Sequence, residues 1–319
     1  MPARQSPPPD VGGLARPRSS PDTDRSSHIP VLLTETVTLL DPKSNEHCID
    51  ATVGGGGHSR ALLERTGPDG RLLAIDLDQH ALDIAADTLA PFSSRVTFAH
   101  DAFDHLSSIR TETQFPEAQC IIADLGLSSI ELSDETRGFS FQHHASPLDM
   151  RFDPSRGGMT AADLLNTARE AELTQIISTY GEERQARTIA RSIVDARTRA
   201  RIITTDDLVN AIIRVYRGKR TKLHPATKTF QAIRIAVNDE FGRLERFLPC
   251  ALAALAPGGR LAVISFHSLE DRTVKRFLRE RAAAGIVTIL TKHPVTPSFA
   301  ETIQNPRSRS AKLRVAMRK

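Results

Sequence analysis

The feature that most constrains the fold is an alternation of short apolar segments and helix-like segments between residues 46 and 125. This alternation is typical of βαβ units, in which parallel strands form a sheet and the helices cover it. We expect strands at 46–52, 71–77, 95–99 and 120–125, and helices at 59–65 and 79–89. The pattern predicts an α/β fold with an open parallel sheet.

The alternation stops after residue 131. Residues 161–215 contain at least three helix-like segments and no convincing strand, with Thr160 and Thr204 as suitable N-caps. Strand character returns at 260–266, and a final strand is expected at 312–317. We therefore expect an α/β domain made of 28–131 and 236–319, interrupted by an all-helical insert at 132–235. Residues 1–27 are rich in Pro, Ser, Arg and Gly and are expected to be a disordered extension.

Positive charge is concentrated in two segments, although the net charge is only +4. Arg197–Lys222 carries eight basic residues against two acidic ones, and the tail after Glu301 carries six basic residues and no acid. Such clusters either neutralise nucleic-acid phosphates or form solvated faces. Aromatic residues make up 5% of the chain and Trp is absent, so a base-stacking platform is not expected to be its main device.

The three cysteines, Cys48, Cys120 and Cys250, are far apart in apolar surroundings, without disulfide or zinc spacing. They are interpreted as buried thiols of a cytoplasmic protein. No apolar run is long enough to cross a membrane, and the N-terminus has no signal-peptide pattern.

A glycine loop, 54–57, lies between the first predicted strand and the first predicted helix. Glycine permits close approach of a ligand, and helix amides favour an anionic group such as the carboxylate of S-adenosylmethionine. The G-x-G-x-x-G pattern of dinucleotide-binding proteins does not fit, which disfavours a dehydrogenase. An acid-x-x-x-G-x-G pattern does fit, with Asp50, Gly54 and Gly56, although a purely structural turn is an alternative.

Acidic residues at the ends of later strands support a nucleotide-like ligand. Asp76 ends the second predicted strand, where a carboxylate can accept both ribose hydroxyls. Asp124 ends the fourth, where a carboxylate can accept a hydrogen bond from a target amine and direct its lone pair toward a methyl group. Phe103 either packs on adenine or belongs to the core, and His58 either contacts the ligand or packs in the loop.

Several longer segments carry a resemblance to one family. These segments are Arg137-Gly138-Phe139-Ser140-Phe141-Gln142, Pro147-Leu148-Asp149-Met150-Arg151, Tyr180-Gly181-Glu182-Glu183, His224-Pro225-Ala226-Thr227, Thr229-Phe230-Gln231-Ala232-Ile233-Arg234-Ile235 and Ser265-Phe266-His267-Ser268-Leu269-Glu270-Asp271-Arg272. In their order and length they resemble the bacterial ribosomal RNA small-subunit methyltransferase H family, from about residue 28 to residue 317.

The resemblance implies a class I, Rossmann-like methyltransferase sheet with a helical insert that recognises RNA. It implies S-adenosylmethionine-dependent N4-methylation of a decoding-centre cytidine in 16S ribosomal RNA, within the 30S subunit. By motif match the donor site falls on Gly56, Gly57, His58, Asp76, Phe103 and Asp124, with Asp124 as the catalytic residue. Family members usually have Gln where this chain has Glu131, which is expected to contact the donor as an acceptor.

Five further residues are candidate substrate contacts. They are Asp149, Arg151, His267, Asp271 and Arg272. Asp149 and Arg151 either hydrogen-bond the base or pair with each other, and the segment from His267 either lines the cytosine pocket or starts a helix with Ser268 as N-cap. We assign no metal, and the oligomeric state stays open. A DNA methyltransferase is disfavoured because Leu-Gly-Leu-Ser-Ser, not Pro-Pro-aromatic, follows Asp124, and a non-catalytic ribosome-assembly factor is the remaining alternative.

Overall fold

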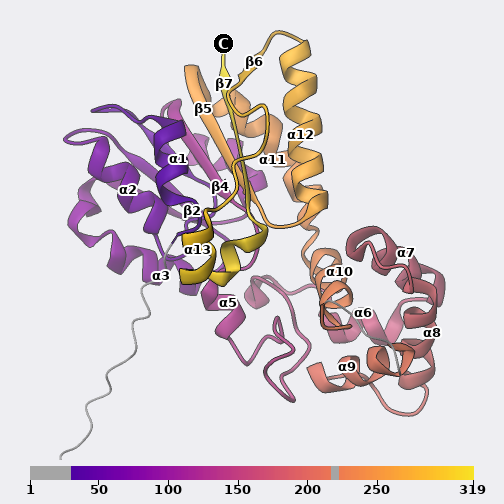
Figure 1. Cartoon of the computed structure of the whole chain (residues 1–319). Helices are drawn as coiled ribbons and strands as arrows, with labels where there is room; N and C mark the ends of the chain where they lie inside the picture. The colour runs from indigo at the N-terminus through magenta and orange to yellow at the C-terminus, as the bar shows by residue number, and fades with distance from the viewer. Residues whose placement is uncertain (1–29, 217–222) are drawn as a thin grey trace, which may run out of the picture.

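The computed structural model describes residues 30–216 and 223–319. The predicted extension at 1–27 and the basic residues Arg217, Lys219, Arg220 and Lys222 lie outside these ranges. Within them, the strands are β1 (Cys48–Asp50), β2 (Leu72–Asp76), β3 (Val96–His100), β4 (Ala118–Asp124), β5 (Leu255–Ser265), β6 (Val287–Ile289) and β7 (Lys312–Arg318). Figure 1 shows them as one twisted sheet with helices on both faces.

The strand order is β3-β2-β1-β4-β5-β7-β6. The first five strands are parallel, whereas β7 is antiparallel to both β5 and β6. The predicted class I methyltransferase sheet is confirmed, because the order reverses between β1 and β4 and a reversed strand lies next to β5. In such sheets, ligands bind at the carboxyl ends of the strands around that switch point.

The sheet is covered by helices that leave and rejoin it. The α-helices are α1 (Leu33–Leu40), α2 (Gly57–Arg65), α3 (Gln79–Thr88), α4 (Leu106–Glu112), α5 (Ser129–Ser133), α6 (Ala161–Thr167), α7 (Glu170–Gly181), α8 (Ala186–Arg197), α9 (Thr205–Ile213), α10 (Thr227–Asn238), α11 (Glu240–Ala254), α12 (Ser268–Ala283) and α13 (Phe299–Gln304). Short 3₁₀ segments are η1 (Ala90–Arg95), η2 (Phe103–His105), η3 (Pro154–Arg156), η4 (Arg214–Tyr216) and η5 (Pro306–Ser310).

Alternate residues of each buried strand enter different cores. In β4, Ile121 and Ala123 pack in a core with α4, α11 and α12, whereas Cys120 and Ile122 pack on the opposite face with α1, α2 and α3. This period of two explains why the parallel strands are continuously apolar. Together the two cores hold the strand ends in fixed register.

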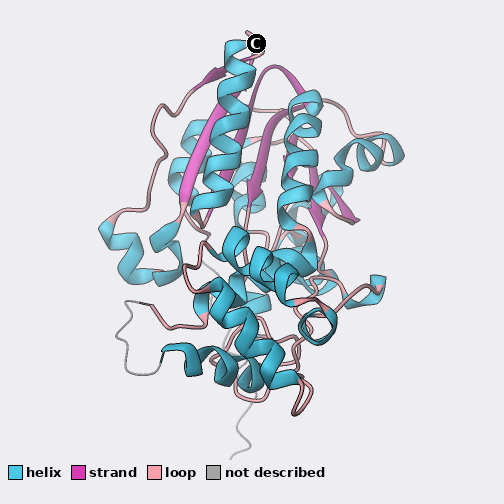
Figure 2. Cartoon of the chain, turned by 90° about the vertical axis from the view of Figure 1, so that its right-hand side faces the viewer, coloured by secondary structure: helices cyan, strands magenta, loops and turns pink. Residues whose placement is uncertain are grey.

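A third core belongs to the helical segment between β4 and β5. It contains buried residues from Phe139 to Ile233, and Figure 2 shows these helices as a group below the sheet. Thr160 and Thr204 each form a capping box, with Asp163 and Asp207, as the sequence predicts for both N-caps. The expected boundary at 235/236 falls inside α10, which continues to Asn238 because its apolar face still packs on this core.

No helix in the described ranges is long and apolar enough to cross a membrane.

Candidate functional site

Three central strands end in aspartate at the same edge of the sheet. Asp50, Asp76 and Asp124 are the last residues of β1, β2 and β4, and His267 follows the end of β5 by two residues. Since β4 and β5 pair in parallel, with Asp124 opposite Ile264, these two strand ends are neighbours. The fold thus brings Asp76, Asp124 and His267, three of the predicted site residues, to one edge of the sheet.

The glycines at the start of α2 are packed closely against other parts of the protein. Gly56 is the N-cap of α2 with φ of 82°, and a Cβ there would lie 3.4 Å from the Ala85 Cα. A Cβ on Gly57 would lie 2.3 Å from the Pro30 Cγ. The first amides of α2 have no acceptor within the helix, which makes this end suitable for an anionic group.

Thr52 joins the ends of β1 and β4. Its hydroxyl oxygen accepts a hydrogen bond from the Asp124 backbone N–H at 2.7 Å, while its own N–H donates to the Asp50 carboxylate at 3.2 Å. Asp50 also accepts from the Ser59 hydroxyl at 2.7 Å, and burial raises the pKa of Asp50 to about 6. Motif matching had not singled out Thr52, although it lies inside the glycine-loop motif.

Asp76 holds two backbone amides. One carboxylate oxygen accepts from the Gly54 N–H and the other from the Asp78 N–H, each at 2.9 Å. Burial raises the pKa of Asp76 to about 6 against the opposing effect of these bonds. Each carboxylate oxygen has a second lone pair. A vicinal diol can therefore bind here without displacing the loop.

Arg137 links this side of the site to the segment leading into α6. Its guanidinium donates to Asp78 at 2.8 Å, to Asp134 at 2.6 Å and to the Phe152 carbonyl at 3.1 Å. Asp78 in turn caps α3. Arg137 was absent from the predicted site residues, although the first family segment begins with it. The Arg137–Asp78 pair is buried, so it holds this loop against the end of β2.

The predicted ligand contacts Phe103 and His58 lie on opposite sides of the site. The half-buried Phe103 ring meets Phe247 edge-on at 5.0 Å and thus packs against the core. His58 is buried, and its Nε2–H donates to the Val31 carbonyl at 3.0 Å, which leaves Nδ1 3.9 Å from an Asp124 carboxylate oxygen.

Asp124 has an unsatisfied carboxylate oxygen. Its Oδ1 is buried and makes no hydrogen bond with any residue in the described ranges. Burial raises the pKa of Asp124 well above its usual value, and the nearby carboxylates of Asp50 and Glu270 raise it further. A buried acceptor without a partner is costly unless a ligand supplies the donor.

Glu131 caps the short helix α5 in a capping box with Ser128. Its carboxylate accepts from the Ser128 N–H at 2.7 Å, and its N–H donates to the Ser128 hydroxyl oxygen at 3.1 Å. Burial, and then the charge of Asp76, raise the pKa of Glu131 to about 8. A carboxyl group that is protonated at neutral pH can donate as well as accept a hydrogen bond, and the contact of Glu131 with the donor stays a prediction.

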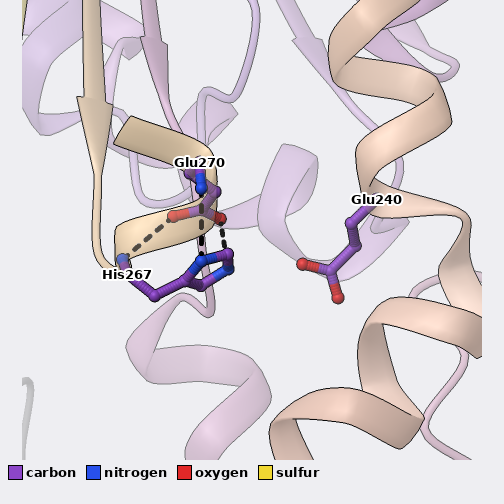
Figure 3. A group of neighbouring side chains, drawn as sticks. All are labelled: Glu240, His267 and Glu270. Atoms are coloured by element: carbon purple, nitrogen blue, oxygen red, sulfur yellow. Dashed lines mark hydrogen bonds and ion pairs between the residues drawn. The ribbon is translucent and has the colours of Figure 1, made fainter. Parts of the chain in front are cut away.

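A cluster of Glu240, His267 and Glu270 lies beyond the end of β5, and Figure 3 shows Glu240 pointing from α11 toward the other two. Their ligand-type atoms lie within 4.8 Å of one another. However, Arg234 donates to both oxygens of Glu240, at 2.7 and 2.8 Å. His267 Nδ1 accepts from the Glu270 N–H at 3.3 Å, so a neutral ring carries its proton on Nε2. These partners favour a network of ion pairs and hydrogen bonds over a metal site.

Glu270 is the most constrained member of this network. Burial alone would raise its pKa, but His267 and Arg234 outweigh burial and hold the pKa below its ordinary value. His267 Nε2 lies 3.1 Å from a Glu270 oxygen. The N-cap of α12 is His267 and not Ser268, because the imidazole supplies the capping acceptor and Glu270 completes the box.

The remaining predicted substrate residues have partners within the protein. Asp149 and Arg151 form a two-bond ion pair with each other, at 2.7 Å for both contacts. Asp271 accepts from Arg314 at 2.6 Å, and Lys312 lies 3.6 Å away. Arg272 is exposed and donates to Glu182 at 3.1 Å. Of these contacts, only the last joins the α/β domain to the helical segment.

Comparison with known proteins identifies the family of the chain. The model of the MraW methylase family matches residues 25–319. The chain is 46% identical to "Ribosomal RNA small subunit methyltransferase H" of Symbiobacterium thermophilum, over 91% of this chain and 96% of that protein. It is 46% identical to the protein of the same name from Thermomicrobium roseum, over 92% and 94%. It is 49% identical to that from Trichormus variabilis, over 92% of each. The chain belongs to the MraW methylase family of S-adenosylmethionine-dependent methyltransferases.

Proposed function

We propose that this protein transfers the methyl group of S-adenosylmethionine to N4 of a cytidine in 16S ribosomal RNA, at the decoding centre of the 30S subunit, in the cytoplasm. The single observation that carries this proposal is the buried, unpartnered Oδ1 of Asp124 at the end of β4. An exocyclic amine offers the N–H that this oxygen lacks. The names of the curated relatives support ribosomal RNA as the substrate.

The donor is assigned to the β1–β2 side of the edge. The carboxylate of its methionine part would meet the first turn of α2 at Gly56, Gly57 and His58, where amides are available. Its ribose would meet Asp76, and its adenine would lie near Phe103. The charge of Asp76 raises the pKa of Glu131, so the two carboxyl groups are close to each other. The carboxyl group of Glu131 would therefore face the same ligand as Asp76.

The target base is assigned to the β4–β5 side. Cytosine N4 is a poor nucleophile because its lone pair is delocalised into the ring. A hydrogen bond from N4–H to Asp124 Oδ1 would hold the amine in line with the methyl group and sulfur, which is mainly a positioning effect. His267 follows the neighbouring strand and would contact the base from the other side. To enter, the nucleotide must leave its stack.

S-adenosylmethionine supplies an electrophilic methyl group on a sulfonium. Asp124 and His267 provide the position of the acceptor, and the N4 proton leaves after transfer. The raised pKa of Asp124 makes its carboxylate a suitable first acceptor for that proton. Cys48 and Cys120 are buried in the sheet and receive no role.

Incubation with labelled donor and 30S subunits from a strain that lacks the modification tests the proposal. Nucleoside analysis of the recovered RNA should show label in N4-methylcytidine. Label in another nucleoside would contradict the assignment of the acceptor. Absence of label in the presence of tight binding would favour a non-catalytic assembly factor.

A further inference from the structure

One face of α12 carries a row of basic side chains. Arg272, Lys275, Arg276 and Arg279, which we call the basic stripe, are all exposed and line one shallow pocket together with Glu280. Their spacing of three, four and seven residues places them on one face of the helix. The opposite face, with Val274 and Leu278, is buried in the core of the α/β domain.

Half of this charge has no partner within the protein. Arg272 donates to Glu182 at 3.1 Å and Arg276 to Glu245 at 3.3 Å. Lys275 and Arg279 form no ion pair or hydrogen bond with the part of the chain that the structure describes. Exposed charges that are not compensated locally attract an oppositely charged partner.

The position of the stripe relates it to the methyl-transfer site. α12 begins directly after His267, next to the strand end that carries Asp124, and extends away along the α/β domain (Figure 1). At its start, Glu182 from the end of α7 contacts both Ser268 and Arg272. The stripe therefore begins where the helical segment meets the α/β domain and runs about 10 Å along the helix axis.

We propose that the basic stripe binds the phosphates of the RNA strand next to the target nucleotide. This inference rests on the proposed function, because a nucleic-acid substrate is what makes phosphate the anion concerned. Anionic lipid offers the same chemistry, but an interfacial helix needs an apolar face, and that face of α12 is buried. The stripe carries no base-reading group, so it sets the register of the RNA and its salt dependence.

The double variant Lys275→Gln, Arg279→Gln tests the stripe, because it removes the two uncompensated charges. Binding of the full-length protein to 30S subunits is measured by filter retention between about 50 and 200 mM salt. We expect about tenfold weaker binding at low salt and a log–log salt slope less negative by about 1.5–2. The matched control is Arg65→Gln, Arg71→Gln, which removes two exposed charges near the other end of the sheet.

Each alternative has a distinct outcome. An equal loss of binding in the control would reduce the effect to net charge and overturn the proposal, as would an unchanged salt slope in the stripe variant. Retained subunit binding together with lost binding to phosphatidylglycerol vesicles would assign the stripe to a membrane. Nucleoside analysis of the wild-type reaction is read separately, so failure of the proposed N4 methylation does not alter the binding result.

Discussion

Asp76 and Asp124 occupy equivalent places at the ends of two parallel strands but differ in how their carboxylates are satisfied. Both oxygens of Asp76 accept backbone N–H groups, from Gly54 and Asp78. The Asp124 backbone N–H donates to Thr52, one of its carboxylate oxygens lies 3.9 Å from His58 Nδ1, and the buried Oδ1 makes no hydrogen bond with the described residues. Burial raises the pKa of both carboxyl groups.

The difference indicates two roles, one in binding the donor and one in positioning the reacting amine. A carboxylate whose loop contacts are already formed binds a ligand with little reorganisation, which suits the holding of the donor. A carboxylate with an unmet hydrogen bond gains most when its partner arrives, which suits the amine that reacts. Variants at the two positions should thus separate binding from turnover.

The largest effect is expected for Asp124→Ala. Removal of the acceptor should lower kcat about 10²–10³-fold, a magnitude typical for one preorganised group at a reacting centre. Donor affinity measured by calorimetry should stay within about twofold of wild type, or under 0.5 kcal/mol. Asp124→Asn keeps an oxygen acceptor but no charge, so its kcat should lie between those of the wild type and of Asp124→Ala. If kcat changes by less than about twofold in both variants, Asp124 is structural.

The next effect concerns Glu131, whose buried carboxyl group lies near Asp76. The unfolded chain releases the Glu131 proton near pH 4.5, whereas the folded protein holds it to about pH 8. Unfolding is therefore coupled to proton release in this window, and wild-type stability should fall as pH rises from 4.5 to 8 relative to Glu131→Gln. Below pH 4.5 the two proteins should converge.

At pH 8 we expect Glu131→Gln to be more stable by on the order of 3 kcal/mol, measured from urea unfolding. Glu112→Gln, at an exposed position, is the control. A stability difference that does not change with pH would show that Glu131 does not titrate in this window.

A third prediction separates donor binding from chemistry at Asp76. Asp76→Ala should weaken donor binding by about 1.5–3 kcal/mol, because hydrogen bonds to a charged group are lost and two loop amides lose their acceptor. With saturating donor, kcat should recover to near the wild-type value. Asp76→Asn should have a smaller effect on affinity. Wild-type affinity in both variants would contradict the ribose assignment.

The smallest effect is expected at His267. His267→Asn keeps an N-cap for α12, since Asn is among the best capping residues, and removes only the ring. We expect kcat/KM for RNA to fall about tenfold, equivalent to about 1.4 kcal/mol, without a change in donor affinity. An unchanged kcat/KM would show that the His267 ring does not contact the RNA.

The sequence predicts the strands well and several of the contacts poorly. The apolar runs of β2, β3 and β4 are long enough to be recognised, and their observed ends lie within two residues of those expected. β6 (Val287–Ile289) was missed because a three-residue strand carries no periodicity and is stabilised only by pairing with β7. The reversed direction of β7 likewise depends on tertiary pairing.

For the site, the sequence suggests candidate residues but not their partners. Asp76 and Asp124 end strands that the apolar pattern reveals, so the sequence alone can propose both as site residues. The carboxylate of Asp76 has hydrogen-bond donors, whereas Oδ1 of Asp124 has none among the described residues. This difference depends on tertiary contacts, and no local sequence pattern predicts it. Asp271 is satisfied by an ion pair that the sequence could not predict, because its partner Arg314 is 43 positions away. The roles assigned to the individual site residues stay predictions.

The helical segment leaves the sheet after β4 and returns before β5, and these two strands are neighbours. The outgoing connection follows Asp124 at the end of β4, and the returning connection reaches Glu240, whose carboxylate lies within 4.8 Å of the His267 ring. The donor loops after β1 and β2 belong to a separate stretch of chain. Such an arrangement is modular. Changes in the segment between residues 132 and 239 can alter which substrate is presented without rebuilding the donor loops. Arg137 and Arg156 are exceptions, because Arg137 pairs with the buried Asp78, and Arg156 donates to Asp101 and to the His100 carbonyl at the end of β3.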